Sequence, residues 1–175
     1  VGSSWQPDED FIIPYFNKHP EMKMVLAPHE ISEDRISGIL TGLKRPVVRY
    51  TKTTPEEAAE ADCLILDCYG ILSKSYRFAT VAYVGGGFGV GIHNINEAAV
   101  YGIPVVFGPK YGKFKEARDL IALEGAFTVS GGDEYALVMN RLLSDGEYLK
   151  KHGEIAGGYI RDNLGATRRI YDAIF

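Results

Sequence analysis

The stretch "TVAYVGGGFGVGIHNINEAAVYGIPVVFG", residues 80–108, decides the fold. It begins with an apolar run at 80–85 and passes through a glycine-rich loop. A helical pattern at 94–101 follows, and then a second apolar run at 104–108. Short apolar runs bounded by glycine and rich in β-branched and aromatic residues are typical of buried strands. The order strand, helix, strand therefore predicts two parallel strands joined by a crossover helix.

The same alternation continues on both sides of this stretch. The strand candidates are 22–28, 46–50, 63–68, 80–85, 104–108 and 126–130. The helix candidates are 8–18, 32–43, 70–78, 94–101, 115–123 and 133–144, followed by two C-terminal helices at 146–162 and 166–174. This order predicts an α/β fold, a Rossmann-like doubly wound parallel sheet of about six strands.

Length and composition favour one domain over residues 1–175. With 46% hydrophobic residues, the chain can bury a full core. The net charge of -4 argues against nucleic acid held through a broad basic surface. The two cysteines, Cys63 and Cys68, suit a reduced, cytosolic setting. We recognise no signal peptide and no membrane-spanning helix.

The first residues, "VGSSW", have the pattern of a strand end running into a polar loop. The body of that strand is missing from the sequence. We therefore expect the chain to be a fragment of a longer protein, cut near a domain boundary.

In doubly wound sheets, ligands bind beyond the carboxyl ends of the strands. That rule selects five loops, at 2–5, 28–31, 67–72, 85–94 and 108–114. They hold most of the unusual residues of the chain. The candidate ligand site lies among them.

The glycine run has five glycines between residues 85 and 91. It is not a dinucleotide fingerprint, because no set of its glycines has the offsets of G-x-G-x-x-G, and no G-K-[ST] follows. One interpretation is a loop that receives an anion through backbone N–H groups and the dipole of the next helix. The other is a tight turn that lets helix 94–101 press on the sheet.

Other polar residues in these loops have two interpretations each. Ser3 and Ser4 suit a phosphate or cap the next helix. His93 is a phosphate donor or a structural histidine. Asn94 and Glu97 form a capping box, or Glu97 accepts hydrogen bonds from the two hydroxyls of a ribose.

The segment "KYGKFK", residues 110–115, interleaves lysines with aromatic residues. Three interpretations are open: a nucleic-acid-binding surface, a loop that contacts an anionic ligand or a membrane surface, or a solvated face. The negative net charge disfavours the first of these. No His, Cys, Asp and Glu residues have metal-ligand spacing, so we expect no metal site, and we expect no bound cofactor.

Several segments together resemble the C-terminal half of 3-deoxy-D-manno-octulosonic acid (Kdo) transferases. The match runs in order over nearly the whole chain and is most specific over 83–114. The segments are "VGSSWQPDED" (1–10), "LAPHEI" (26–31), the block from "DCYGILSK" to "KFKEA" (67–117) and "NLGATRRI" (163–170).

The resemblance implies a GT-B glycosyltransferase with two Rossmann-like domains facing a cleft. This chain would bind the donor, CMP-Kdo. An N-terminal domain absent from this chain would hold the lipid A precursor and the catalytic base. The reaction implied is an inverting, metal-independent transfer in lipopolysaccharide core synthesis, at the cytoplasmic face of the bacterial inner membrane. The isolated domain is expected to be inactive.

The resemblance also implies roles for individual residues. Many members carry Pro-Arg-His where this chain has Pro28, His29 and Glu30. The residues implied to bind phosphate and ribose are Ser3, Ser4, Gly86, Gly87, His93, Asn94 and Glu97. The residues implied to form the base pocket are Pro28, His29, Gly70, Ile71 and Leu72.

Two alternatives stay open beside this reading. One is a different GT-B enzyme, a transferase or epimerase that uses a UDP-sugar. The other is a non-catalytic nucleotide-binding module.

Overall fold

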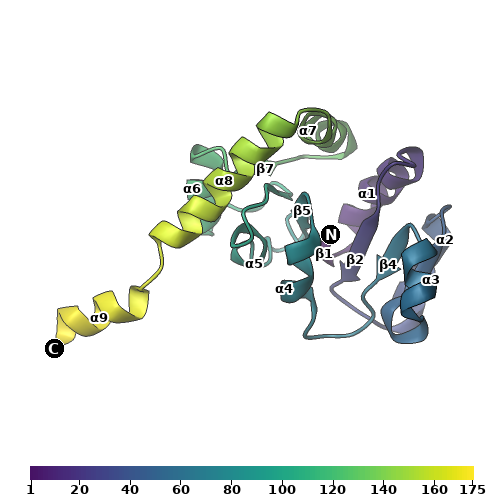
Figure 1. The fold of residues 1–175 in the computed structure, drawn as a ribbon, viewed down its shortest axis with the longest axis horizontal. Helices are drawn as coiled ribbons and strands as arrows, with labels where there is room; N and C mark the ends of the chain where they lie inside the picture. Colours follow the sequence, from purple (N-terminus) through teal and green to yellow (C-terminus); the bar gives the residue numbers. More distant parts are fainter.

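The computed structural model describes the backbone of residues 1–175 and all side chains except those of 166–169. A parallel sheet forms its centre, with helices on both faces (Figure 1). Most strands are only three residues long, and β5 and β6 are buried on both faces, as strands covered by helices should be. The strands are β1 (Gly2–Ser4), β2 (Met24–Pro28), β3 (Val47–Arg49), β4 (Cys63–Ile65), β5 (Ala82–Val84), β6 (Val105–Phe107) and β7 (Ala126–Thr128).

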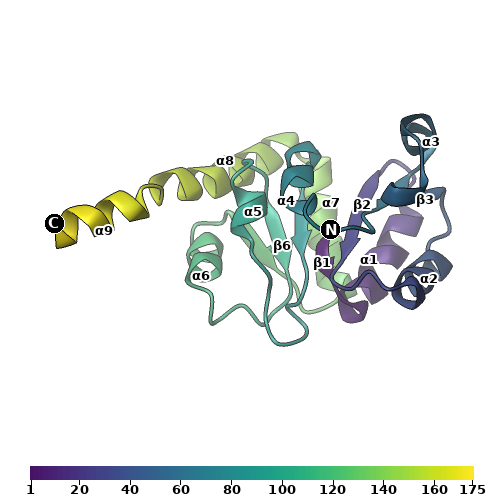
Figure 2. The same ribbon diagram turned by 90° about the horizontal axis from the view of Figure 1, so that it is seen from below.

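The strands alternate with helices for most of the chain. After β7 the chain is helical, and α9 extends away from the sheet in both views (Figures 1 and 2). The α-helices are α1 (Gln6–Lys18), α2 (Glu33–Gly42), α3 (Pro55–Glu60), α4 (Leu72–Ser75), α5 (Asn96–Ala99), α6 (Lys115–Ala122), α7 (Gly132–Ser144), α8 (Gly146–Asp162) and α9 (Ala166–Ile174); the 3-10 helices are η1 (Tyr50–Lys52) and η2 (Tyr76–Phe78).

The strand order in the sheet is β3-β4-β2-β1-β5-β6-β7, with every pair parallel. β2, β3 and β4 lie on one side of β1, and the later strands β5, β6 and β7 lie on the other side. Gly2 pairs with Ala27 of β2 and with Val84 of β5. The sheet order therefore reverses at β1, which makes its carboxyl end the expected ligand position.

The two faces of the sheet carry separate apolar clusters. The first cluster packs α1, α2 and α7 against one face, with Leu26, Tyr83 and Val106 from the strands. The second packs η2, α5, α6 and α8 against the other face, with Val84 and Phe107. Neighbouring residues of one strand thus face different clusters, which explains why β5 and β6 are apolar throughout.

The predicted doubly wound α/β sheet is confirmed, with seven strands where about six were expected. The additional strand is β1, of which the sequence shows only the end. The helix expected at 94–101 is shorter, because α5 covers only Asn96–Ala99 and Ile95 occupies its N-cap position. Asn94 is therefore not the N-cap residue, which rules out the capping-box interpretation and leaves the other interpretation of Glu97 a prediction.

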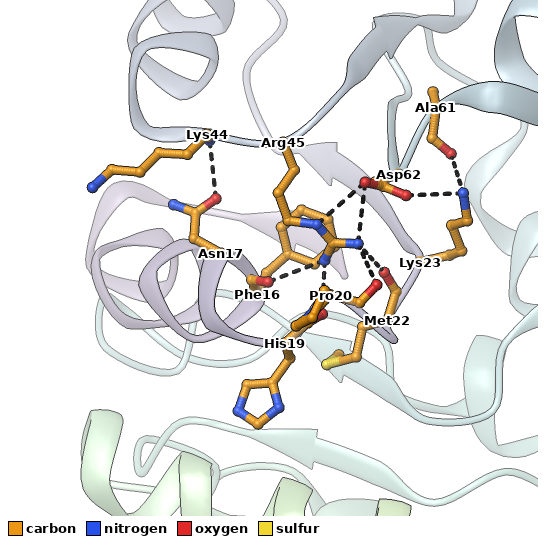
Figure 3. Close-up of polar contacts among 10 residues, drawn as sticks. All are labelled: Phe16, Asn17, His19, Pro20, Met22, Lys23, Lys44, Arg45, Ala61 and Asp62. Carbon is orange, nitrogen blue, oxygen red and sulfur yellow. Dashed lines mark hydrogen bonds and ion pairs between the residues drawn. The ribbon is translucent and has the colours of Figure 1, made fainter.

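Arg45 ties the end of α1 to the starts of β2 and β4 (Figure 3). Its guanidinium donates to four main-chain carbonyls, those of Phe16, His19, Pro20 and Met22, and to the carboxylate of Asp62. The guanidinium also lies 4.1 Å from the centre of the Phe16 ring. All five N–H groups of the arginine are used, which a lysine could not reproduce.

Candidate functional site

Three aromatic rings stack where the carboxyl ends of β1, β2 and β5 meet. The ring of Trp5 lies 4.5 Å from that of His29, and the ring of His29 lies 4.5 Å from that of His93. These residues follow three different strands, so the sheet topology alone brings them together. The stack stands at the point where the sheet order reverses.

The hydrogen bond from Trp5 defines the state of His93. The indole Nε1 donates to Nε2 of His93 at 3.3 Å, so Nε2 is the acceptor. A neutral imidazole then carries its proton on Nδ1. Burial, with the nearby His29, lowers the pKa of His93 below its usual value. His93 can therefore offer one N–H donor to a ligand at neutral pH.

A buried aspartate in the first turn of α1 holds these loops in place. The carboxylate of Asp8 accepts hydrogen bonds from the backbone of Trp5 at 2.9 Å, the hydroxyl of Tyr83 at 2.7 Å and the backbone of Gly86 at 3.2 Å. Burial, together with Asp8, raises the pKa of Tyr83, so the phenol stays protonated and remains a donor. Asp8 thus fixes the loops after β1 and β5 relative to each other.

A second buried carboxylate, Glu9, lies beside it. Its side chain accepts a hydrogen bond from Ser4 Oγ at 2.7 Å and pairs with the guanidinium of Arg35. The hydroxyl of Ser4 is therefore already engaged within the fold. Ser3 is half-buried and has a φ of 52°, in the left-handed region that non-glycine residues rarely adopt. Both serines belong to β1, where a loop was predicted, and their contact with phosphate stays a prediction.

The glycine loop packs closely against its neighbours within the protein. A Cβ on Gly85 would collide with the carbonyl oxygen of Ser3. A Cβ on Gly87 would lie 2.6 Å from the Cα of Gly108. The Gly87 carbonyl also accepts from the backbone of Lys110 at 2.9 Å. Internal packing against β1 and against the loop after β6 is thus sufficient to require glycine at 85 and 87, and these contacts do not involve the helix at 94–101. The contact of Gly86 and Gly87 with phosphate stays a prediction.

Asn94 and Glu97 are linked at the start of α5. The side-chain amide of Asn94 donates to Glu97 at 3.1 Å, and Asn94 Oδ1 accepts from the backbone of Asn96 at 3.1 Å. A capping box requires Glu97 to accept from a backbone N–H, so this arrangement is not one. Burial raises the pKa of Tyr76, and the half-buried carboxylate of Glu97 nearby raises it further. The remaining acceptor sites of Glu97 are available to a ligand.

The loop between β4 and α4 carries the predicted base-pocket residues. Gly70 is exposed with a φ of 89°, Ile71 precedes α4, and the Leu72 side chain reaches beneath Gly2. Leu72 thus links this loop to β1, and the role of Gly70, Ile71 and Leu72 as a base pocket stays a prediction. Asp67, at the start of this loop, is held by hydrogen bonds from Arg49 and Thr51.

Asp67 accepts from the backbone and hydroxyl of Thr51, at 2.9 and 2.6 Å, and from Arg49 at 2.8 Å. Burial alone would raise its pKa, but these hydrogen bonds together hold the pKa of Asp67 below its usual value. The carboxylate therefore stays charged, and the loop stays attached to the end of β3.

Sequence reasoning missed three residues that organise this edge: Trp5, Asp8 and Glu9. Trp5 is the only tryptophan of the chain and directly follows β1, which was the available signal. The two carboxylates had no such signal, because acidic residues in the first turn of a helix are usually solvated. Arg35, a residue of α2, proves to be the partner of Glu9.

Over the part of the chain that the structure describes, no three His, Cys, Asp or Glu side chains are grouped as a metal site would require. No described helix combines the length and the apolar character needed to cross a bilayer.

Known proteins share sequence and fold with this chain. No family model matches. A 3-deoxy-D-manno-octulosonic acid transferase from Aquifex aeolicus is 32% identical over 169 residues, which are 91% of this chain and 46% of the relative. The chain is similar to Kdo transferases. A second such transferase, from Bordetella pertussis, is 30% identical over 158 residues, which are 89% of this chain and 37% of the relative. The predicted resemblance is confirmed, and the chain spans less than half the length of these relatives.

A solved structure shares the fold. The C-terminal CMP-Kdo binding domain of WaaA from Acinetobacter baumannii superposes with a TM-score of 0.77 and 23% identity. The match covers 89% of this chain and 84% of that one. At this level of identity the likeness shows the fold, which is the predicted Rossmann-like type.

Proposed function

We propose that this chain is the donor-binding domain of a Kdo transferase and that it binds CMP-Kdo. The observation that carries the proposal is the contact between His29 and His93 at the point where the sheet order reverses, with Glu97 on the helix that follows His93. The similarity to Kdo transferases supports it, as does the fold shared with a CMP-Kdo binding domain. The complete protein would then transfer Kdo to a lipid A precursor held by a second, N-terminal domain.

The geometry suggests how CMP would lie. The phosphate would face the Nδ1–H of His93 and the backbone of the loop from Gly86 to Asn94. The carboxylate of Glu97, already oriented by Asn94, would accept hydrogen bonds from both ribose hydroxyls. The base would lie between the loop at Pro28 and His29 and the loop at 70–72.

Transfer requires the CMP phosphate to leave with its negative charge stabilised. Preorganised N–H donors aimed at that phosphate would supply this stabilisation without a metal ion, and His93 is such a donor. The catalytic base would come from the N-terminal domain, and attack opposite the leaving group would invert the anomeric centre. The chain alone would therefore bind the donor without transferring Kdo.

The acceptor of such an enzyme is a lipid precursor, so we also propose that the complete protein acts at the cytoplasmic face of the inner membrane. The lysines of the loop at 110–115 would then lie near anionic headgroups. Sedimentation of the chain with anionic vesicles, compared with a variant in which Lys110 and Lys113 are glutamate, tests this part separately.

Calorimetric titration with CMP, UDP and NAD tests the donor assignment. We expect saturable heat with CMP, at least tenfold weaker binding of UDP, and none with NAD. Preference for UDP would favour a UDP-sugar enzyme, and absence of heat with millimolar CMP would refute the proposal.

A further inference from the structure

Asp8 is a fully buried carboxylate at the carboxyl edge of the sheet. It lies in the first turn of α1, where the peptide dipoles of the helix favour an anion. Three hydrogen-bond donors converge on it, from β5 and from the residues that follow β1 and β5. Because the side chain has no exposed surface, it cannot touch a ligand. Any effect of Asp8 on the nucleotide site must pass through the groups that it holds.

One oxygen of this carboxylate joins two loops. Asp8 Oδ2 accepts from the backbone N–H of Trp5 at 2.9 Å and from the backbone N–H of Gly86 at 3.2 Å. The other oxygen, Oδ1, accepts from the hydroxyl of Tyr83 at 2.7 Å. The residue after β1 and the loop after β5 are thereby fixed to a single atom.

The hydrogen bond to Gly86 controls the position of the His93 ring. A Cβ on Gly86 would lie 3.0 Å from Cδ2 of His93, so the glycine backbone packs directly against the imidazole. The backbone N–H of His93 also donates to the carbonyl of Gly85 at 3.1 Å, which joins the two ends of the loop. Holding Gly86 in place therefore holds the imidazole in place.

The hydrogen bond to Trp5 controls the partner of that imidazole. Trp5 is the N-cap residue of α1, so the direction of its backbone decides where the indole points. The indole stacks on His29 and donates from Nε1 to Nε2 of His93 at 3.3 Å. The donor and the acceptor of this bond thus belong to two loops, and Asp8 is bonded to both of their backbones.

The bond from Trp5 decides which nitrogen of His93 carries the proton. An isolated neutral imidazole prefers its proton on Nε2, but in a protein the hydrogen bond made by one ring nitrogen selects the tautomer. Nε2 of His93 must accept, so the proton lies on Nδ1. At 3.3 Å the bond is already long, so a small displacement of either loop would break it.

We propose that Asp8 is a positioning residue of the nucleotide site: through the backbone N–H groups of Trp5 and Gly86 it holds His93 in the tautomer that offers Nδ1–H to a phosphate. The phosphate contact rests on the proposed function, whereas the control of the tautomer applies to the free protein. Without the carboxylate both loops are released, and the imidazole returns to its ordinary preference for a proton on Nε2. Nδ1 would then present a lone pair to the phosphate, which repels an anion.

NMR of the imidazole nitrogens in the nucleotide-free protein, at a pH well above the titration range of histidine, tests this role. Protonated and unprotonated ring nitrogens differ widely in their 15N chemical shifts, so the tautomer is read directly. In the parent chain we expect the proton of His93 on Nδ1. In Asp8→Ala we expect it on Nε2 in most molecules, together with a loss of CMP affinity of about tenfold.

Two further variants separate positioning from stability. Asp8→Asn keeps one side-chain oxygen for the two backbone N–H groups, so it should restore the parent tautomer. Asp62→Ala removes a carboxylate at the opposite edge of the sheet, where it pairs with Lys23 at 2.9 Å. This variant should lower the Tm without moving the proton of His93.

An unchanged tautomer of His93 in Asp8→Ala would overturn the proposal, as would an equal change in Asp62→Ala. If Asp8→Ala fails to fold, Trp5→Phe tests the same route, because it keeps an aromatic ring against His29 and removes only the donor. An unchanged tautomer in Trp5→Phe would overturn the proposal too.

The two readouts also separate this proposal from the assignment of the donor. A changed tautomer with unchanged CMP affinity would overturn the role of Asp8 in nucleotide binding. Absence of CMP binding by the parent chain would instead refute the proposed function, and the control of His93 by Asp8 would still be decided by the 15N shifts.

Discussion

His93 combines two constraints in one side chain. Its Nε2 accepts from Trp5, and its ring stacks on His29. The first constraint leaves the donor on Nδ1, and burial together with the nearby His29 disfavours a positive charge on His93. The residue is thereby held neutral but able to donate, which suits a phosphate that must be bound and later released.

NMR titration of the imidazole resonances tests this state. In the free protein we expect His93 to titrate below 6.5, the ordinary pKa of histidine. Because the folded pKa is below the unfolded value, protonation favours unfolding, so this residue lowers stability as pH falls through that window. CMP should move the titration upward, since a phosphate stabilises the imidazolium. An unchanged midpoint with saturating CMP would exclude contact with the phosphate.

Glu97 is the second residue to test. In the variant Glu97→Gln the side chain can still accept the hydrogen bond from Asn94, so the start of α5 should persist. It loses the charge and one of the two acceptors for a ribose diol. We expect CMP affinity to fall about tenfold, or about 1.4 kcal/mol, with little change in Tm.

The matched control is Glu154→Gln, an exposed glutamate on α8. It should leave both affinity and Tm unchanged. Equal CMP affinities of the two variants would remove Glu97 from the ribose site.

At the scale of elements, the glycine loop is part of the sheet edge and not a separate flap. Gly87 lies against Gly108, so the loop after β5 and the loop after β6 approach without side chains between them. Gly89, by contrast, has its nearest neighbour at 3.5 Å, an ordinary contact.

These two glycines form a pair for comparison. Gly87→Ala must displace the backbone of Gly108, and we expect the free energy of unfolding to fall by about 1–3 kcal/mol. Gly89→Ala should change it by less than about 1 kcal/mol, since the added methyl group has room. Urea denaturation measures both. Equal losses would show that the close approach at Gly87 is not what requires glycine.

At the opposite edge of the sheet, Arg45 holds the end of α1 against the starts of β2 and β4. Arg45→Lys keeps one charge near Asp62 but cannot satisfy four carbonyls as well. We expect a loss of about 2–4 kcal/mol in the free energy of unfolding. Arg77→Lys, at an exposed position on η2, should be nearly neutral. If Arg45→Lys leaves the free energy of unfolding unchanged, water replaces the lost donors at no cost.

For the whole molecule, the sequence was sufficient for the fold class because strand and helix patterns alternate clearly. Buried runs such as Val105–Phe107 and caps such as Ser32 mark their elements locally. The rule that ligands bind at the carboxyl edge selected loops that the structure brings together at that edge. The predicted residues His29 and His93 indeed lie in contact there.

What the sequence could not reveal depends on three-dimensional contacts. The partners of Asp8 and Glu9 lie up to 78 residues away, as in the bond from Gly86 to Asp8. Gly87 must be glycine because Gly108 of another loop lies against it. Local patterns carry no information about such pairs, so these features required the structure.

The place of Trp5 has a spectroscopic consequence. The chain contains one tryptophan, so its intrinsic emission comes from a single point in the molecule. That point lies against His29 and is hydrogen-bonded to His93. Indole emission responds to the charge and polarity of its surroundings. The protein therefore carries its own optical probe at the edge where the nucleotide is proposed to bind, and occupancy can be followed in solution without any attached dye.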